Sequence, residues 1–158
     1  MSHSITVASL QMCPRFGDVS ANRRTVAHMV RSVRRADLIV LPELAFSGYA
    51  FRDRQQAFEV AEPATPASET IRMLHVASRE SGATIVAGFC ERGPGDVLFN
   101  SAVVVMPDRG LERVYRKVHL FDRERSVFEA GDRFESFDLP LRNGGSARIG
   151  LLICFDWY

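Results

Sequence analysis

The sequence predicts an α/β protein in which a mixed β-sheet carries helices on one face. In the first half of the chain, short apolar β-rich runs alternate with segments whose apolar residues recur at helical spacing. In the second half, two longer β-rich runs flank Pro107-Asp108-Arg109-Gly110, a turn composition typical of an antiparallel hairpin. The chain has 158 residues, 46% hydrophobic and 25% charged, which is the size and composition of one globular domain spanning 1–158.

Strand and helix patterns follow one another in the first fifty residues. Residues 5–10 are apolar and β-rich, which predicts a strand. Ser20 is expected to cap a helix, because apolar residues recur after it at i, i+3, i+4 and i+7. Residues 38–41 are a continuous apolar run of the kind found in strands covered on both faces, and Pro42 ends this run.

A second helix and several further strands are expected after residue 50. Residues 51–60 are weakly helical, and Thr65 with Pro66 supplies a cap and a first-position proline for a helix that stops near Gly82. Residues 84–89 predict another buried strand. Later expected strands are 98–106, 111–115, 135–139 and 147–153, with a charged loop over 118–132. Helices on one face leave the other face of the sheet apolar, so a second sheet, from this chain or a partner, is the expected cover.

Charge and cysteine content exclude several function classes. The net charge of +1 gives no electrostatic footprint for nucleic acid. MSHSITVASLQM lacks the pattern of a signal peptide, and no segment approaches the roughly 20 apolar residues that span a bilayer, so we expect a cytoplasmic protein without membrane contact. Cys13, Cys90 and Cys154 are odd in number and widely spaced, so we expect free thiols and no structural metal site. We also expect no cofactor.

Glu43, Lys117 and Cys154 each follow a predicted strand. In open α/β sheets, functional sites gather beyond the carboxyl ends of strands. Lys117 is the only lysine among 20 basic residues, which is explained either by chance or by a site that needs a compact ammonium. Taken singly, a cysteine in an apolar run is more often an inert core residue, and the two charged residues are more often solvated.

Together, these residues supply the parts of a hydrolytic reaction. A thiol with a pKa of about 8.5 needs a base, and Glu43 fits that role. Attack of Cys154 on an amide carbon leaves negative charge on oxygen, which the Lys117 ammonium and the Phe155 backbone N–H can stabilise by about 3 kcal/mol per good donor. His119 offers a rival base, because cysteine-histidine pairs also hydrolyse amides, and we rank it below Glu43.

Three stretches of the sequence carry a family resemblance. LIVLPELAFSGY, VYRKVHLFDRERSVFEAGD and GLLICFDWY resemble, in this order, the signature blocks of the nitrilase superfamily, the carbon-nitrogen hydrolases. The resemblance runs over residues 5–158. It implies an α-β-β-α sandwich and a Glu-Lys-Cys triad that maps onto Glu43, Lys117 and Cys154.

The resemblance also bears on residues around the triad. The family often has a second glutamate after its lysine; Glu124 matches best, and Glu129 is a weaker candidate. Family enzymes that act on nitriles tend to follow the cysteine with Trp-Glu, whereas Phe155 and Asp156 follow it here, which favours amide or N-carbamoyl amide substrates. Asn100 lies where the family often has an asparagine, and we interpret it as a structural residue that caps or bridges backbone.

Members of this family continue well beyond the nucleophile, so the resemblance implies that the domain over 1–158 is incomplete at its C-terminus. It also implies a homo-oligomer, a dimer or higher. Two hypotheses stay open. The first is an enzyme that hydrolyses a small-molecule amide through a thioester acyl-enzyme. The second is a truncated, inactive remnant or interaction protein of the same fold.

Overall fold

The structure is a computed structural model that describes residues 4–158. A mixed five-stranded sheet forms its centre. Its strands lie in the order β1-β2-β3-β4-β5. They are β1 (Val7–Ser9), β2 (Leu38–Val40), β3 (Thr84–Arg92), β4 (Leu98–Met106) and β5 (Gly110–Arg116). β1, β2 and β3 pair in parallel, whereas β3 and β4 pair antiparallel. β4 and β5 also pair antiparallel, as the hairpin composition predicted.

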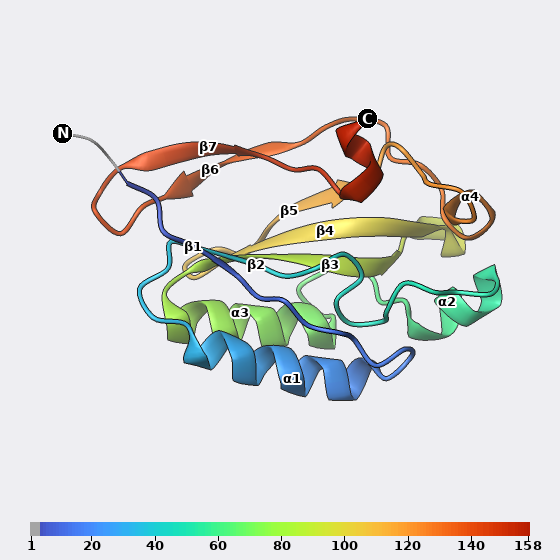
Figure 1. Cartoon of the computed structure of the whole chain (residues 1–158), viewed down its shortest axis with the longest axis horizontal. Helices are drawn as coiled ribbons and strands as arrows, with labels where there is room; N and C mark the ends of the chain where they lie inside the picture. The colour runs from blue at the N-terminus through green and yellow to red at the C-terminus, as the bar shows by residue number, and fades with distance from the viewer. Residues whose placement is uncertain (1–3) are drawn as a thin grey trace.

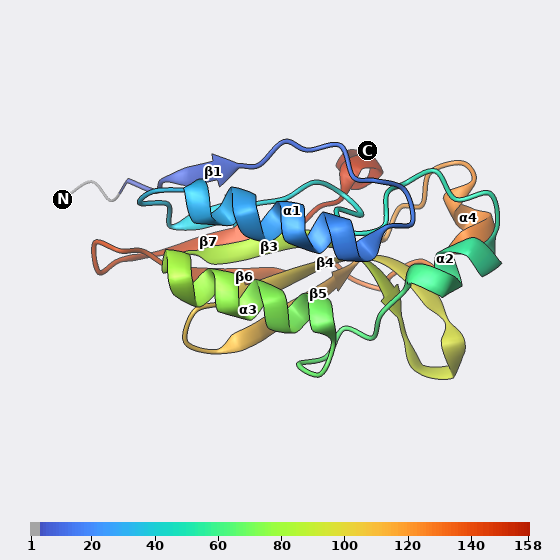
Figure 2. The same ribbon diagram turned by 90° about the horizontal axis from the view of Figure 1, so that it is seen from below.

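Two helices cover one face of this sheet. Helices α1 (Val19–Ser32) and α3 (Glu69–Ser81) lie side by side beneath the strands, as Figure 1 and Figure 2 show from two directions. Their apolar stripes, which include Val26 and Leu74, pack against sheet residues such as Ile39 and Ile85, all of them fully buried. The predicted mixed sheet with helices on one face is therefore confirmed.

A second, two-stranded sheet covers part of the opposite face (Figure 1). Its strands β6 (Ser136–Pro140) and β7 (Ser146–Gly150) pair antiparallel. Phe137 and Leu139 of β6 are buried against Val104 and Tyr115 of the main sheet. The expected cover of the apolar face is thus supplied by this chain, and the helix, sheet and sheet layers form the α-β-β part of the predicted sandwich.

The two main helices begin at different residues from those expected. Asp18, not Ser20, caps α1, and its carboxylate accepts a hydrogen bond of 2.9 Å from the Ala21 N–H. Ser68 caps α3, so the helix starts after Pro66 rather than at it. A carboxylate or hydroxyl oxygen at either of two nearby positions can cap a helix, and the apolar pattern alone does not choose between them.

The bounds of three short elements differ from those expected. Helix α2 (Arg54–Val60) is shorter than expected, and helix α4 (Glu124–Val127) interrupts the expected charged loop. β7 ends at Gly150 rather than at residue 153, because the Ile153 N–H bonds to the Asp156 side chain instead of a strand. Cys154 therefore begins a 3-10 turn, η2 (Cys154–Trp157). Among the helices described, none is long and apolar enough to cross a bilayer.

Candidate active site

Glu43 lies in a loop that follows β2 and passes close over β3. A Cβ atom added to Gly88 of β3 would lie 2.3 Å from the Pro42 carbonyl oxygen and 2.6 Å from the Glu43 Cα. Glycine at position 88 therefore permits the close contact between this loop and the sheet. The side chain of Asn22 in α1 holds the far end of the loop, donating a hydrogen bond of 2.7 Å to the Phe46 carbonyl.

Lys117 directly follows β5, and both its backbone N–H and its backbone carbonyl form hydrogen bonds. Its N–H donates to the Asn100 carbonyl of β4 at 2.8 Å, and its carbonyl accepts from the Gly131 N–H at 2.8 Å. A Cβ atom on Gly131 would lie only 2.2 Å from the carbonyl oxygen of Arg116, so this crossing also requires glycine. The Lys117 side chain is fully buried.

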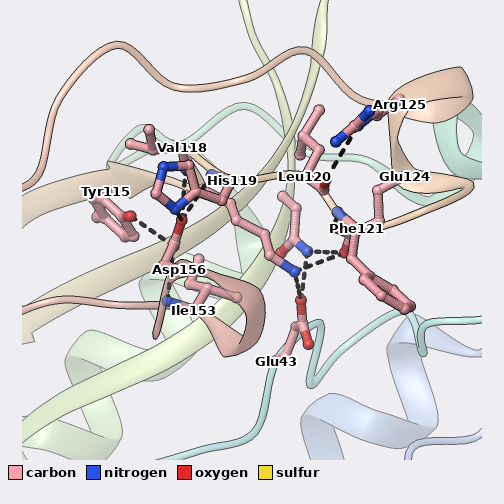
Figure 3. A network of polar contacts seen from close by, with 12 residues as sticks. Glu43, Tyr115, Val118, His119, Leu120, Phe121, Glu124, Arg125, Ile153 and Asp156 are labelled. Atoms are coloured by element: carbon pink, nitrogen blue, oxygen red, sulfur yellow. Dashed lines mark hydrogen bonds and ion pairs between the residues drawn. The ribbon is translucent and has the colours of Figure 1, made fainter. Parts of the chain in front are cut away.

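The Lys117 ammonium lies between two carboxylates. Its Nζ is 2.7 Å from Oε1 of Glu43 and 2.9 Å from Oε1 of Glu124, and Figure 3 shows the two glutamates converging from different segments. Burial alone would lower the pKa of Lys117, but its hydrogen bonds to the two carboxylates outweigh this effect, and the pKa is raised. The amine is therefore a fixed positive charge.

Asn100 belongs to the same cluster. Its side-chain Nδ2 donates to Oε1 of Glu43 at 2.7 Å and to Oε1 of Glu124 at 2.9 Å, so it contacts the same two oxygens as Lys117. Asn100 is fully buried. Its side chain thus bridges two carboxylates, and the interpretation of this side chain as a backbone cap or bridge was wrong.

The two candidates for a second glutamate lie in different surroundings. Glu124 begins α4 and is buried; its Oε2 accepts from the Phe121 N–H at 2.7 Å while its Oε1 faces the cluster. Glu129 is exposed, and its backbone N–H bonds to the Leu98 carbonyl. The structure therefore brings Glu124, and not Glu129, to Lys117.

Cys154 starts η2 with a positive φ of 45°, a conformation that residues other than glycine seldom adopt. Although the residue is exposed, partial desolvation of the sulfur raises the pKa of the Cys154 thiol. The negative charges of Glu43 and Glu124 raise this pKa further, while the Lys117 charge and the Phe155 N–H lower it. The net direction is upward, so the group is a protonated thiol at neutral pH.

The other two cysteines have different environments. Cys90 is buried in β3, where burial raises the pKa of its thiol to about 12, so it is inert at neutral pH. Cys13 is exposed, as Cys154 is. The chain therefore contains one buried thiol, one exposed thiol and one exposed thiol surrounded by charges.

Tyr49 is a site residue that sequence reasoning missed. Burial raises the pKa of its hydroxyl, and the negative charges of Glu124 and Glu43 raise it further, so the hydroxyl stays protonated. Tyr49, Phe121 and Glu124 line a cavity of about 280 Å³ beside the cluster. Tyr49 is the last residue of the LIVLPELAFSGY stretch, and its place there was the available clue.

His119, the rival base, makes its contacts elsewhere. Its side chain is 46% exposed, and its Nδ1 lies 4.0 Å from Oδ1 of Asp156. Its ring packs edge-on against Phe134, with ring centroids 5.8 Å apart. These contacts hold the imidazole beside Asp156, whereas the charges that act on the thiol are those of Glu43, Lys117 and Glu124.

Residues 6–158 match the sequence model of the family described as carbon-nitrogen hydrolase. The chain belongs to this family. Similar members of the carbon-nitrogen hydrolase family include a nitrilase of Pyrococcus abyssi, 43% identical over 157 residues, which cover 98% of this chain and 57% of that protein. An (R)-stereoselective amidase of a Pseudomonas species is 38% identical over 148 residues, covering 93% of this chain and 50% of the amidase. The chain thus spans about half the length of these relatives.

Solved structures of carbon-nitrogen hydrolases share the fold. A CN-hydrolase superfamily protein of Xanthomonas campestris, whose structure holds an arsenic adduct in its active site, superposes with a TM-score of 0.80 at 24% identity. The superposition covers 98% of this chain and 55% of that one. An N-terminal amidase superposes with a TM-score of 0.79 over 96% of this chain and 40% of its own. At this level of identity, the likeness concerns the architecture.

Proposed function

We propose that this carbon-nitrogen hydrolase cleaves a small amide or N-carbamoyl amide through a thioester on Cys154. One observation carries the assignment of roles. Three carboxylate oxygens near Lys117 accept hydrogen bonds from Lys117, Asn100 or Phe121. They are Oε1 of Glu43 and both oxygens of Glu124. Within residues 4–158, both hydrogen bonds of the Glu43 carboxylate go to Oε1, which leaves Oε2 for the thiol.

Because Oε2 of Glu43 accepts none of these hydrogen bonds, whereas both oxygens of Glu124 accept one or more, the pattern supports Glu43 as the base and Glu124 as the residue that holds Lys117. In the first step, the Cys154 sulfur attacks the amide carbon and its proton passes to Glu43. The carbonyl oxygen becomes an oxyanion, which the Lys117 ammonium and the Phe155 N–H stabilise. Glu43 then returns the proton to nitrogen, the carbon-nitrogen bond breaks, and ammonia or an amine leaves the thioester.

The second half of the reaction uses the same groups. Glu43 takes a proton from water, whose oxygen attacks the thioester carbon, and the same oxyanion forms again. The carbon-sulfur bond then breaks, the sulfur regains the proton from Glu43, and a carboxylic acid is released. The raised pKa of Cys154 suits this scheme, because the thiol needs a base only at the moment of attack.

The resemblance to family enzymes implies a preference for amides over nitriles, because Phe155 and Asp156 follow the cysteine in place of Trp-Glu. The relatives include proteins named as a nitrilase and as an amidase, so both substrate classes belong in the test. The purified chain is incubated with simple amides, N-carbamoyl amides and nitriles. We expect ammonia release from an amide class and an intact-mass increase equal to one acyl group, both abolished in Cys154→Ala.

A second candidate function is the binding of another polypeptide by an inactive chain. No acyl-enzyme and no ammonia with any of the three substrate classes, from a chain whose Cys90 stays protected from alkylation, would favour this candidate and contradict the enzyme.

A further inference from the structure

Asp156 is a buried carboxylate that the proposed mechanism does not use. It accepts four hydrogen bonds, and Figure 3 shows it between the segments that supply them. Oδ2 accepts from the Tyr115 hydroxyl at 2.6 Å and from the Ile153 N–H at 2.9 Å. Oδ1 accepts from the Val118 N–H at 3.1 Å and from the His119 N–H at 2.7 Å.

Two of these four donors are next to site residues in the sequence. Ile153 directly precedes Cys154, and Val118 directly follows Lys117. One carboxylate therefore joins the backbone before the sulfur to the backbone after the ammonium, although the two segments are 35 residues apart in sequence. Asp156 is 5% exposed and has both oxygens occupied, so it is not placed to meet a substrate.

The turn that carries Cys154 needs such a support. With a φ of 45°, Cys154 has a backbone conformation that is unfavourable for an L-residue and that persists only when its surroundings fix it. The turn η2 has four residues, so its own hydrogen bonds are few. The bond from Ile153 N–H to Asp156 closes the turn across Cys154.

We propose that Asp156 is a positioning residue that holds the Cys154 thiol in register with Lys117 and Glu43. The value of this register for hydrolysis rests on the proposed function. The register itself can be measured on the chain without any substrate, so failure of one inference is distinguishable from failure of the other. A carboxylate that merely stabilised the fold would leave the coupling between Glu43 and Cys154 unchanged.

The three cysteines give three readouts in one experiment. The chain is alkylated with iodoacetamide over a range of pH, and each cysteine is followed by peptide mass spectrometry. Cys154 reports the site, exposed Cys13 is the internal reference, and buried Cys90 reacts only if the fold opens. The midpoint of the Cys154 profile measures the effect of the charges that face the sulfur, which are those of Glu43, Lys117 and Glu124, with the Tyr49 hydroxyl beside them.

The coupling is measured with a double-mutant cycle. In the native background, Glu43→Gln is expected to lower the Cys154 midpoint by about one pH unit, because a neighbouring negative charge is removed. In Asp156→Ala, the sulfur is no longer held beside Glu43, so the same substitution is expected to shift the midpoint by less than half as much. Asp138→Asn, which removes an exposed carboxylate of β6, is the control and should leave the full shift.

Two milder variants keep the inference testable if Asp156→Ala unfolds and exposes Cys90. Tyr115→Phe removes one donor to Asp156, and Asp156→Asn replaces one accepting oxygen by an amide nitrogen; each should reduce the shift in part. An undiminished shift in Asp156→Ala with Cys90 protected overturns the inference. If Asp156→Ala is unfolded, an undiminished shift in Tyr115→Phe overturns it. A chain that shows the coupling but hydrolyses nothing contradicts only the proposed function.

Discussion

At the scale of single residues, the cluster around Lys117 is a compact set of charges with little access to water. Lys117 and Asn100 donate to the same two carboxylate oxygens, and Lys117 and Glu124 are both buried. Removing one partner from such a pair leaves an uncompensated charge, which costs about 3–5 kcal/mol. The cluster is thus both a set of site residues and a part of the folded core.

Glu43→Gln is predicted to move two rates in opposite directions. Hydrolysis should fall by about 10²–10⁴-fold, because the general base is lost. Alkylation of Cys154 at neutral pH should rise several-fold, because the pKa of the thiol falls when the Glu43 charge is removed. The two rates are measured by ammonia release and by peptide mass spectrometry. Undiminished hydrolysis in Glu43→Gln would contradict the role of Glu43 as the base, and slower alkylation of Cys154, with Cys90 protected, would contradict the predicted fall in the pKa of the thiol.

The positions of Glu43 and Lys117 could be predicted because a strand end is visible in the sequence. The bridging role of Asn100 could not, because it depends on where β4 lies relative to α4 and to the loop after β2. The orientation of Cys154 was missed for a similar reason. The run up to residue 153 looks like one strand, and only the bond from Ile153 to Asp156 shows why the strand ends earlier.

At the scale of elements, glycines set how closely loops approach the sheet. Gly88→Ala is predicted to displace the Glu43 loop, because the new Cβ would lie 2.3 Å from the Pro42 carbonyl oxygen. We expect a loss of about 1–3 kcal/mol in the free energy of unfolding, measured by urea denaturation, together with reduced hydrolysis. Gly150→Ala in β7 is the matched control, since its Cβ would meet no atom within 4 Å. Equal stability of the two variants would argue against the close contact.

The start of α3 carries a pH-dependent contribution to stability. Partial burial would raise the pKa of Glu62, but hydrogen bonds from Ser68 and Thr70 and the charge of Arg23 outweigh it and lower the pKa. A lowered pKa in the folded state gives stability that is present above the unfolded value of about 4.3 and is lost as the pH falls through the folded value.

The free energy of unfolding of Glu62→Gln should therefore fall less between pH 7 and pH 3 than that of the native chain. At pH 7 it should cost about 2 kcal/mol, because a charged hydrogen-bond acceptor at the helix start is lost. Urea unfolding at pH 3, 5 and 7 measures both effects. Glu59→Gln, on the exposed side of α2, is the control and should follow the native curve. A native-like pH dependence in Glu62→Gln would rule out this contribution.

At the scale of the whole molecule, the two sheets are held together by one apolar layer. Phe137 is 2% exposed within this layer, so Phe137→Ala is predicted to lower the free energy of unfolding by about 3–5 kcal/mol. Phe134, which is 53% exposed, offers a matched control, and Phe134→Ala should cost far less. Thermal or urea unfolding measures the free energy of unfolding of both variants. If Phe137→Ala lowers the free energy of unfolding as little as Phe134→Ala does, the second sheet is only loosely attached.

The overall layering could be predicted from the pattern of strands and helices, including the need for a cover over the second face of the main sheet. The identity of the cover could not, because residues 135–153 do not show by themselves against which face they pack. Burial of Phe137 and Leu139 against Val104 and Tyr115 resolves this, and it depends on contacts between distant parts of the chain.

Acylation of the single lysine also offers a way to measure how often the site opens. Because the Lys117 amine is buried between two carboxylates, a water-borne acylating reagent can reach it only when the cluster opens. The slow appearance of one acetyl group on that peptide would therefore time the breathing of the site. A ligand that closes the cavity beside Tyr49 should lengthen that time.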